Sequence, residues 1–174
     1  MARRNDGGYS VKKILCLAAI AVAMATTPAA AEDDPEFLSF STGAFDINDN
    51  DTTGMLGVEY RSDFKKFFLT PMAGAFVTAK GGVYGYGGVF VDVFLGHRVV
   101  LRPSFSAGAY ADGNGKDLGG VLEFRSAIAL AWRFDDRSRL GIEFAHLSNA
   151  GIYDVNPGTE NLTVNYSMPL DSLF

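Results

Sequence analysis

The stretch from Val121 to Phe134, VLEFRSAIALAWRF, decides the fold. Side chains alternate between the two faces of a β-strand. One face of this stretch is therefore apolar and aromatic, with Leu122, Phe124, Ser126, Ile128, Leu130, Trp132 and Phe134. The other face is small or charged, with Glu123, Arg125, Ala127, Ala129, Ala131 and Arg133. A strand of this length with aromatic residues toward one end is typical of a membrane-spanning β-barrel, although a strand of a soluble β-sandwich would also alternate.

The rest of the chain from Phe37 onward consists of similar segments separated by turn residues. They predict an all-β protein, an eight-stranded antiparallel transmembrane β-barrel of the outer membrane. The expected strands lie near 37–45, 53–61, 66–77, 84–95, 98–109, 121–134, 139–148 and 159–168. The first four alternate poorly, so the sequence does not assign their faces. Pro71 and Pro103 fall inside expected strands and predict bulges or frayed ends, because proline cannot donate to the ladder.

The expected connections alternate in length. Short turns are predicted near Ser62-Asp63, at Gly96-His97 and at Asp135–Ser138, and longer connections at 46–52, 78–83, 110–120 and 149–158. Outer-membrane barrels have short periplasmic turns and longer external loops. This pattern predicts that the longer connections face outward. The terminal aromatic residue, Phe174, is a weaker sign of the same class.

The N-terminus has the pattern of a cleaved secretory signal peptide over residues 1–31, which leaves 32–174 as the barrel and catalytic domain. Arg3, Arg4, Lys12 and Lys13 precede an apolar run over 14–27 and the small residues 29–31. That run is shorter than a membrane-spanning helix requires. The remaining chain has no cysteine and carries 11 basic and 19 acidic residues, a net charge of −8. Such an acidic protein is a poor candidate for nucleic-acid binding.

Three residues with the potential for chemistry share the predicted lipid-facing surface. His146 and Ser148 continue the apolar row of Leu140, Ile142 and Phe144, with Cα atoms about 6.6 Å apart. Glu160 extends the apolar row of the next expected strand, 159–168, back by one step. It lies at the start of that strand, beside the end of the expected strand 139–148. A histidine beside a serine hydroxyl can activate it as a nucleophile, and a carboxylate can orient the imidazole.

Each of these residues alone is explained more simply as an interfacial residue with local hydrogen bonds, because polar groups facing lipid are tolerated near the interface. Their arrangement on one face favours a Ser-His-Glu site. From the pattern alone both interpretations stay open.

A resemblance decides between them. The segment His146-Leu147-Ser148-Asn149-Ala150-Gly151, followed by Asn156-Pro157-Gly158-Thr159-Glu160, resembles the signature of the PagL-type lipid A 3-O-deacylases, also called acyloxyacyl hydrolases. Segments 120–125 and 140–142 fit the same family, and the likeness is specific over about 118–170. The resemblance implies Ser148 as nucleophile, His146 as base and Glu160 as orienting acid. It further implies that Asn149 and the Gly151 N–H form the oxyanion hole, with no metal or cofactor.

By this resemblance the protein is a serine esterase of the bacterial outer membrane that removes the 3-O-linked 3-hydroxyacyl chain from lipid A of lipopolysaccharide. Its site would face the outer leaflet, with lipid A and outer-membrane lipids as its partners. Two alternatives remain: a non-enzymatic small barrel for adhesion or envelope integrity, and an esterase acting on phospholipids. The sequence leaves the oligomeric state open, a homodimer included.

Other polar groups have simpler interpretations. The residues Asp46, Asn48, Asp49, Asn50 and Asp51 lack the glycine and distal glutamate of a calcium loop and predict a polar external loop. His97 is expected to be a solvated turn residue. The inward-facing Glu123, Arg125, Arg133 and Glu143 predict an ion-pair network that fills the barrel.

Overall fold

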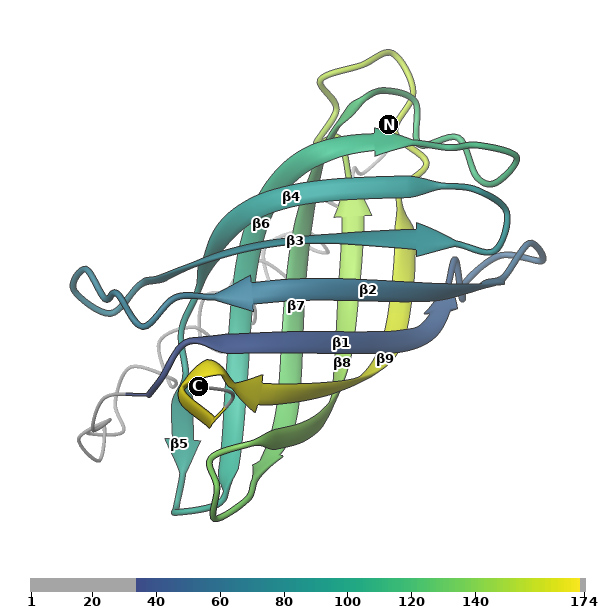
Figure 1. Ribbon diagram of the computed structural model, residues 1–174. Helices are drawn as coiled ribbons and strands as arrows, with labels where there is room; N and C mark the ends of the chain where they lie inside the picture. The colour runs from purple at the N-terminus through teal and green to yellow at the C-terminus, as the bar shows by residue number, and fades with distance from the viewer. Residues whose placement is uncertain (1–33, 173–174) are drawn as a thin grey trace, which may run out of the picture. The chain divides into compact units, whose positions relative to one another are not determined.

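Antiparallel strands close into a barrel in the computed structural model, which describes residues 34–172 (Figure 1). The predicted signal peptide, 1–31, and Phe174 lie outside the described residues. The described part contains β1 (Phe37–Phe45), β2 (Thr53–Arg61), β3 (Thr70–Thr78), β4 (Val83–Phe90), β5 (Val93–Leu95), β6 (Val99–Ala111), β7 (Leu122–Arg133), β8 (Arg139–Ser148), β9 (Thr159–Pro169) and the 3-10 turn η1 (Leu170–Ser172). Pairing of β1 with β9, and of β4 and β5 with β6, closes the sheet. The predicted eight-stranded antiparallel barrel is confirmed, because β4 and β5 both pair with β6 and together form one of its eight strands. No helix in residues 34–172 is long and apolar enough to cross a membrane.

The two prolines explain where the ladders stop. Strands β4 and β5 occupy one place in the barrel and keep one register against β6, but the ladder is interrupted opposite Pro103. Val91 N donates to Pro103 O at 3.1 Å, and Pro103 has no N–H to return the bond. Pro71 likewise lies one residue beyond the last β2–β3 pair, Arg61 with Met72.

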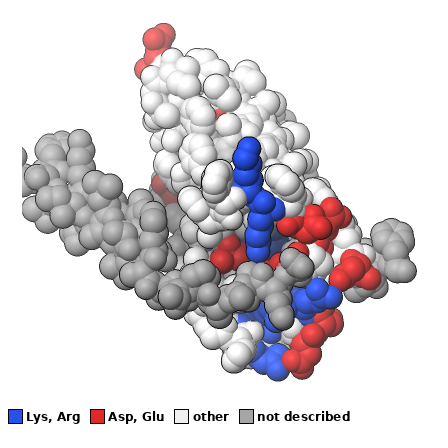
Figure 2. Space-filling model, turned by 90° about the vertical axis from the view of Figure 1, so that its left-hand side faces the viewer, with Lys and Arg blue, Asp and Glu red and all other residues white. Residues whose placement is uncertain are grey.

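Alternation in the C-terminal half follows the prediction. Along β7, β8 and β9, the residues expected to face outward are exposed or half-buried, and those between them are nearly all buried. Ile128, Ile142 and Val164 are each about half exposed. On the face drawn in Figure 2, uncharged residues cover the upper part of the barrel, and charged residues gather toward the lower end. The exposed large apolar side chains of these strands suit contact with lipid better than contact with water.

The connections differ from the prediction at one place. The tight turn expected near Ser62-Asp63 is wrong, because β2 ends at Arg61 and β3 begins at Thr70. Within this longer connection, Lys66 and Leu69 exchange two backbone hydrogen bonds around Phe67, whose φ is 61°. The first residues of the expected strand 66–77 instead form this turn, in which the aromatic side chains of Phe67 and Phe68 are exposed. The end of the barrel expected to have only short turns therefore also carries one long connection, 62–69, so loop length alone does not distinguish the two ends.

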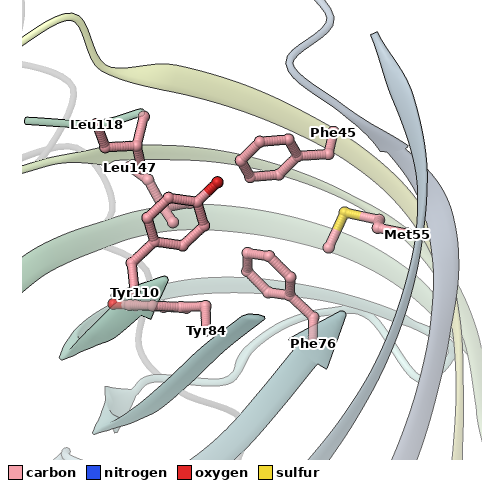
Figure 3. Close-up of a cluster of buried hydrophobic side chains, with 7 residues drawn as sticks. All are labelled: Phe45, Met55, Phe76, Tyr84, Tyr110, Leu118 and Leu147. Atoms are coloured by element: carbon pink, nitrogen blue, oxygen red, sulfur yellow. The ribbon is translucent and has the colours of Figure 1, made fainter. Parts of the chain in front are cut away.

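The end that carries connections 46–52, 79–82, 112–121 and 149–158 is called the site end here. Beneath it lies an apolar cluster inside the barrel, composed of Phe45, Met55, Phe76, Tyr84, Tyr110, Leu118 and Leu147 (Figure 3). Leu118 comes from connection 112–121 and is 1 % exposed, so this connection folds inward over the mouth of the barrel.

Charged groups fill the rest of the interior. Glu143 pairs with Arg125 and lies 3.6 Å from Arg102, and Glu59 lies 3.2 Å from Arg61. A cavity of about 30 Å³ remains among these groups. The predicted network is confirmed for Arg125 and Glu143. It is wrong for Glu123 and Arg133, which make no ion pair with any residue in 34–172, although Glu123 is fully buried.

Candidate active site on the outward face of β8 and β9

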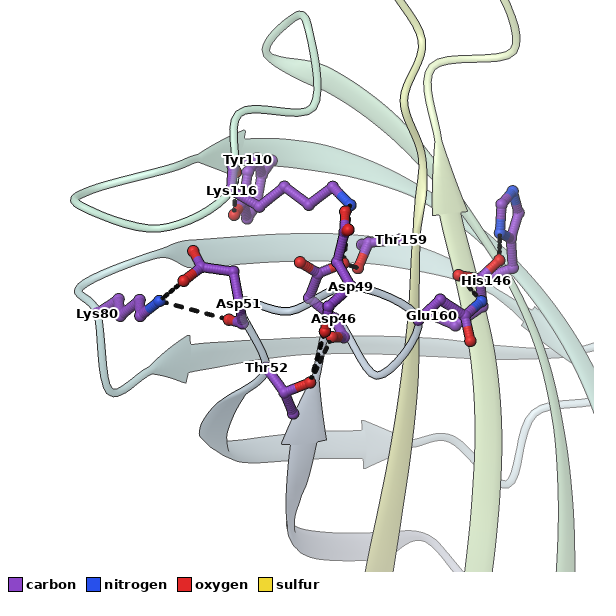
Figure 4. Close-up of polar contacts among 11 residues, drawn as sticks. Asp46, Asp49, Asp51, Thr52, Lys80, Tyr110, Lys116, His146, Thr159 and Glu160 are labelled. Carbon is purple, nitrogen blue, oxygen red and sulfur yellow. Dashed lines mark hydrogen bonds and ion pairs between the residues drawn. The ribbon is translucent and has the colours of Figure 1, made fainter.

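His146 and Glu160 contact each other at the site end. They are direct partners in the β8–β9 register, and His146 Nδ1 lies 3.0 Å from Glu160 Oε1 (Figure 4). Because an ionised carboxylate only accepts hydrogen bonds, this contact places the proton of a neutral imidazole on Nδ1. The other ring nitrogen, Nε2, is then left with a lone pair and can act as a base.

Ser148 lies two residues beyond His146 on the same outward face and is half-buried. Its partner across the β7–β8 ladder is Phe124, and the partner of His146 is a second serine, Ser126. Among residues 34–172 no hydrogen bond joins Ser148 to His146. The strand spacing of about 6.6 Å between their Cα atoms is within the reach of a rotated imidazole and a serine hydroxyl. The structure thus brings all three predicted triad residues to one patch, with the His–Glu contact formed.

Gly158 borders the imidazole from the connection before β9. Its φ is 64°, a conformation that favours glycine, and a Cβ at this position would lie 3.1 Å from His146 Cε1. The glycine therefore leaves room for the ring at the edge that carries Nε2.

Asn149 and Gly151, the predicted oxyanion donors, are engaged within the chain. They lie in a turn in which Ile152 N donates to Asn149 O at 3.1 Å and Ala150 and Gly151 have positive φ. The Asn149 side chain is buried. Its Nδ2 donates to Leu118 O and Val155 O at 2.9 and 2.8 Å, and its Oδ1 accepts from Gly151 N at 3.0 Å. Asn149 thus ties connections 112–121 and 149–158 together, a contact that strand counting could not reveal.

Replacing Asn149 should therefore destabilise the barrel. Asn149→Ala leaves two carbonyl oxygens without their donor, at a cost of about 1–3 kcal/mol each when such a group is buried. Asn149→Asp keeps the acceptor for the Gly151 N–H but lacks both donors, so it should lose at least as much. Urea unfolding in detergent micelles measures the loss, with Asn114→Ala in the exposed part of 112–121 as control. Unchanged stability in both Asn149 variants would contradict this structural role.

Sequence reasoning missed one residue of the site, Asn48. Its Nδ2 donates to Glu160 Oε2, the carboxylate oxygen that does not face His146. The sequence suggested only a polar loop here. Barrel closure was the available signal: β1 pairs with β9, so the connection after Phe45 has to pass beside the start of β9.

The carboxylates of this loop bind lysines. Asp46 and Asp49 both contact Lys116 Nζ, at 2.8 and 2.6 Å, and Asp51 pairs with Lys80 (Figure 4). The spacing of these residues does not match a calcium loop, and the three carboxylates form ion pairs with lysines.

Comparison with known proteins points to one family. The family model described as Lipid A 3-O-deacylase (PagL) matches residues 38–169. The Lipid A deacylase PagL of Bordetella bronchiseptica is 33% identical over 63 residues, which are 36% of this chain. These residues span about a third of that relative, 34% of its length.

A solved structure shows the same fold. The crystal structure of the outer membrane enzyme PagL superposes with a TM-score of 0.62 at 20% identity, covering 77% of this chain and 99% of the other. At this identity the likeness carries the architecture alone.

Proposed function

This chain belongs to the lipid A 3-O-deacylase (PagL) family, and we propose that it is an outer-membrane serine esterase that removes the 3-O-linked 3-hydroxyacyl chain from lipid A. In this proposal residues 1–31 are a cleaved export signal, and the site end faces the outer leaflet. The family model covers nearly all of the barrel. The observation within the chain that supports the chemistry best is the contact of His146 Nδ1 with Glu160 Oε1 beside Ser148.

We assign Ser148 as the nucleophile. His146 Nε2 takes the Ser148 proton while Oγ bonds to the ester carbonyl carbon, and the tetrahedral oxyanion forms. The C–O bond to the sugar oxygen then breaks, and His146 returns the proton to that oxygen. Water, deprotonated by His146, next attacks the acyl-enzyme, and the serine oxygen leaves with the proton as the fatty acid is released. Glu160 holds the Nδ1–H tautomer and stabilises the imidazolium in both steps.

Oxyanion stabilisation is assigned to Asn149 and the Gly151 N–H. A donor in such a position contributes about 2.7–4 kcal/mol to the transition state. In this role the Gly151 N–H would donate to the oxyanion in place of Asn149 Oδ1. The Asn149 Nδ2 would give up its hydrogen bond to Leu118 O or Val155 O and donate to the oxyanion as well.

The outward position of the site supports a membrane lipid as substrate. His146, Ser148 and Glu160 lie on the face that carries Ile142, Phe144 and Leu162, so a lipid reaches the site laterally without entering the barrel. Phe124, the partner of Ser148 across the ladder, stacks on Phe105 with ring centroids 6.0 Å apart. This aromatic surface suits an acyl chain that extends from the ester.

The substrate is tested with the purified barrel, refolded in detergent and incubated separately with lipid A and with diacyl phospholipids. We expect lipid A to lose the mass of one 3-hydroxyacyl group, with free 3-hydroxy fatty acid appearing by mass spectrometry and phospholipids unchanged. Release of fatty acid from phospholipids alone would replace lipid A as the substrate. If neither lipid A nor the phospholipids release a fatty acid, the esterase function is contradicted.

A further inference from the structure

The Glu160 carboxylate has two partners from two different segments. Oε1 faces His146 Nδ1 on β8, and Oε2 accepts a hydrogen bond from Asn48 Nδ2 in the connection between β1 and β2. The Glu160 side chain is 23 % exposed, so it lies in the rim of the site and not in the packed interior. Packing alone therefore does not fix its rotamer.

We propose that Asn48 is a positioning residue of the active site, whose side-chain amide holds Glu160 in the orientation that presents Oε1 to His146. This inference rests on the proposed esterase function and adds a fourth residue to the Ser-His-Glu group. Asn48 acts on the acid, and it contacts neither His146 nor Ser148 in the hydrogen bonds of the described chain.

The backbone places Asn48 at this carboxylate. Ile47 N donates to Glu160 O at 3.0 Å, so the residue before Asn48 is bonded to the main chain of Glu160 itself. One residue earlier, the buried Asp46 accepts from Thr159 Oγ1 at 2.9 Å through Oδ1. Connection 46–52 is thereby joined to the first two residues of β9, and the reach of the Asn48 side chain to Glu160 follows.

A lysine from another connection holds the loop in this position. Lys116 Nζ lies 2.8 Å from Asp46 Oδ1 and 2.6 Å from Asp49 Oδ2, on either side of Asn48 in sequence (Figure 4). The hydrogen bond from Lys116 lowers the pKa of Asp49. Burial alone would lower the pKa of Lys116, but the hydrogen bonds to Asp46 and Asp49, together with the attraction of their negative charges, raise it. Lys116 and Asp49 thus favour each other's charged form, and the ion pairs hold the loop on both sides of Asn48.

A neutral amide suits this role better than a cation. Glu160 stabilises the imidazolium that forms during catalysis because it is negatively charged. A lysine or arginine at position 48 would fix the carboxylate but would also offset that charge. The Asn48 amide restricts the side chain, which otherwise has several rotamers to lose, and leaves the charge available to His146.

Two substitutions of Asn48 separate positioning from packing. Asn48→Ala removes the donor. Asn48→Asp has the same shape but replaces the donor with a negative charge against Glu160. Asn50→Ala and Asn50→Asp are the matched controls, because Asn50 lies in the same loop with an exposed side chain. Ester hydrolysis is measured on lipid A and on a p-nitrophenyl ester, with heat-modifiable mobility confirming that each barrel is folded.

We expect Asn48→Ala to lower kcat about 10- to 100-fold, by analogy with the loss of a group that orients a metal-binding side chain, with KM little changed. The kcat of Asn48→Asp should be lower than that of Asn48→Ala, and the kcat of both Asn50 variants should equal that of the parent. In a Glu160→Ala background, Asn48→Ala should have no further effect, because residues that act through one another are not additive. Equal kcat for the Asn48 and Asn50 variants, or a full effect of Asn48→Ala without Glu160, would overturn the inference.

A readout that does not need activity keeps this inference separate from the proposed function. The chain has two histidines, and His97 lies in the 96–98 connection at the opposite end of the barrel, so it serves as an internal reference. The ¹⁵N shifts of the His146 imidazole in micelles should report the Nδ1–H tautomer in the parent and a mixture in Asn48→Ala. If the parent hydrolyses no ester, the proposed function fails, and the tautomer shift still decides the role of Asn48. An unchanged tautomer in both Asn48 variants would overturn it.

Discussion

Ser148→Ala is expected to lower the release of 3-hydroxy fatty acid from lipid A by about 10⁴- to 10⁶-fold, the range seen when one member of a serine triad is removed. The hydroxyl is the atom that bonds to the acyl carbon, so no other group of the triad can substitute for it. Its side chain is half-buried on the outward face and makes no hydrogen bond within the described chain, so the barrel should fold as before. Mass spectrometry of lipid A from cells expressing the parent or the variant measures the effect.

Ser126 provides the control for this prediction. It is exposed on the same outward face of β7 and is the direct cross-strand partner of His146, so it is the other serine beside the imidazole. Ser126→Ala should retain activity. If Ser126→Ala instead lost activity while Ser148→Ala kept it, the nucleophile would be Ser126 and the assignment drawn from the 146–151 segment would be wrong.

The barrel was predictable because a strand pattern records which face each side chain occupies. In β7, β8 and β9 nearly every position carries a side chain with a clear preference, and the predicted faces are correct. In β4 the outward and inward rows are interrupted by Gly85, Gly87 and Gly88, which carry no preference. A Cβ on Gly88 would lie 2.2 Å from Phe105 O, so close approach of β4 to β6 is what the glycine permits. Backbone proximity of this kind leaves no trace in an alternation of polarity.

The site was predictable only as far as one strand pair reaches. The shared outward face of His146, Ser148 and Glu160 follows from the period of two, and the pairing of His146 with Glu160 follows from the adjacency of β8 and β9. The roles proposed for them come from the family resemblance. Asn48 and Lys116 come from connections whose conformation depends on contacts between loops distant in sequence. The predicted oxyanion residues show the same limit, because the Asn149 amide is committed to Leu118 O and Val155 O in two different segments.

Glu143→Leu is expected to lower the free energy of unfolding by about 3–5 kcal/mol, the cost of leaving a buried charge without its partner. Glu143 is 8 % exposed and pairs with Arg125, with Arg102 3.6 Å away. The variant leaves both guanidinium groups without a carboxylate partner. The cavity beside them has a volume of about 30 Å³ and holds few waters to solvate them. Urea unfolding of the refolded barrel in micelles measures the loss. Adding Arg125→Met to Glu143→Leu should recover part of it, because an apolar replacement of a buried pair is often close to neutral.

Glu160→Leu is the matched control, because it makes the same substitution on the opposite face of the neighbouring strand. Glu143 faces the interior of β8, whereas Glu160 faces outward on β9 and contacts His146. The two variants should therefore give crossed results. Glu143→Leu should lose stability while its folded fraction hydrolyses lipid A at the parent rate, and Glu160→Leu should lose activity with a much smaller change in stability. Loss of both properties in either variant would show that the interior network and the outward site are coupled, which the alternation of strand faces argues against.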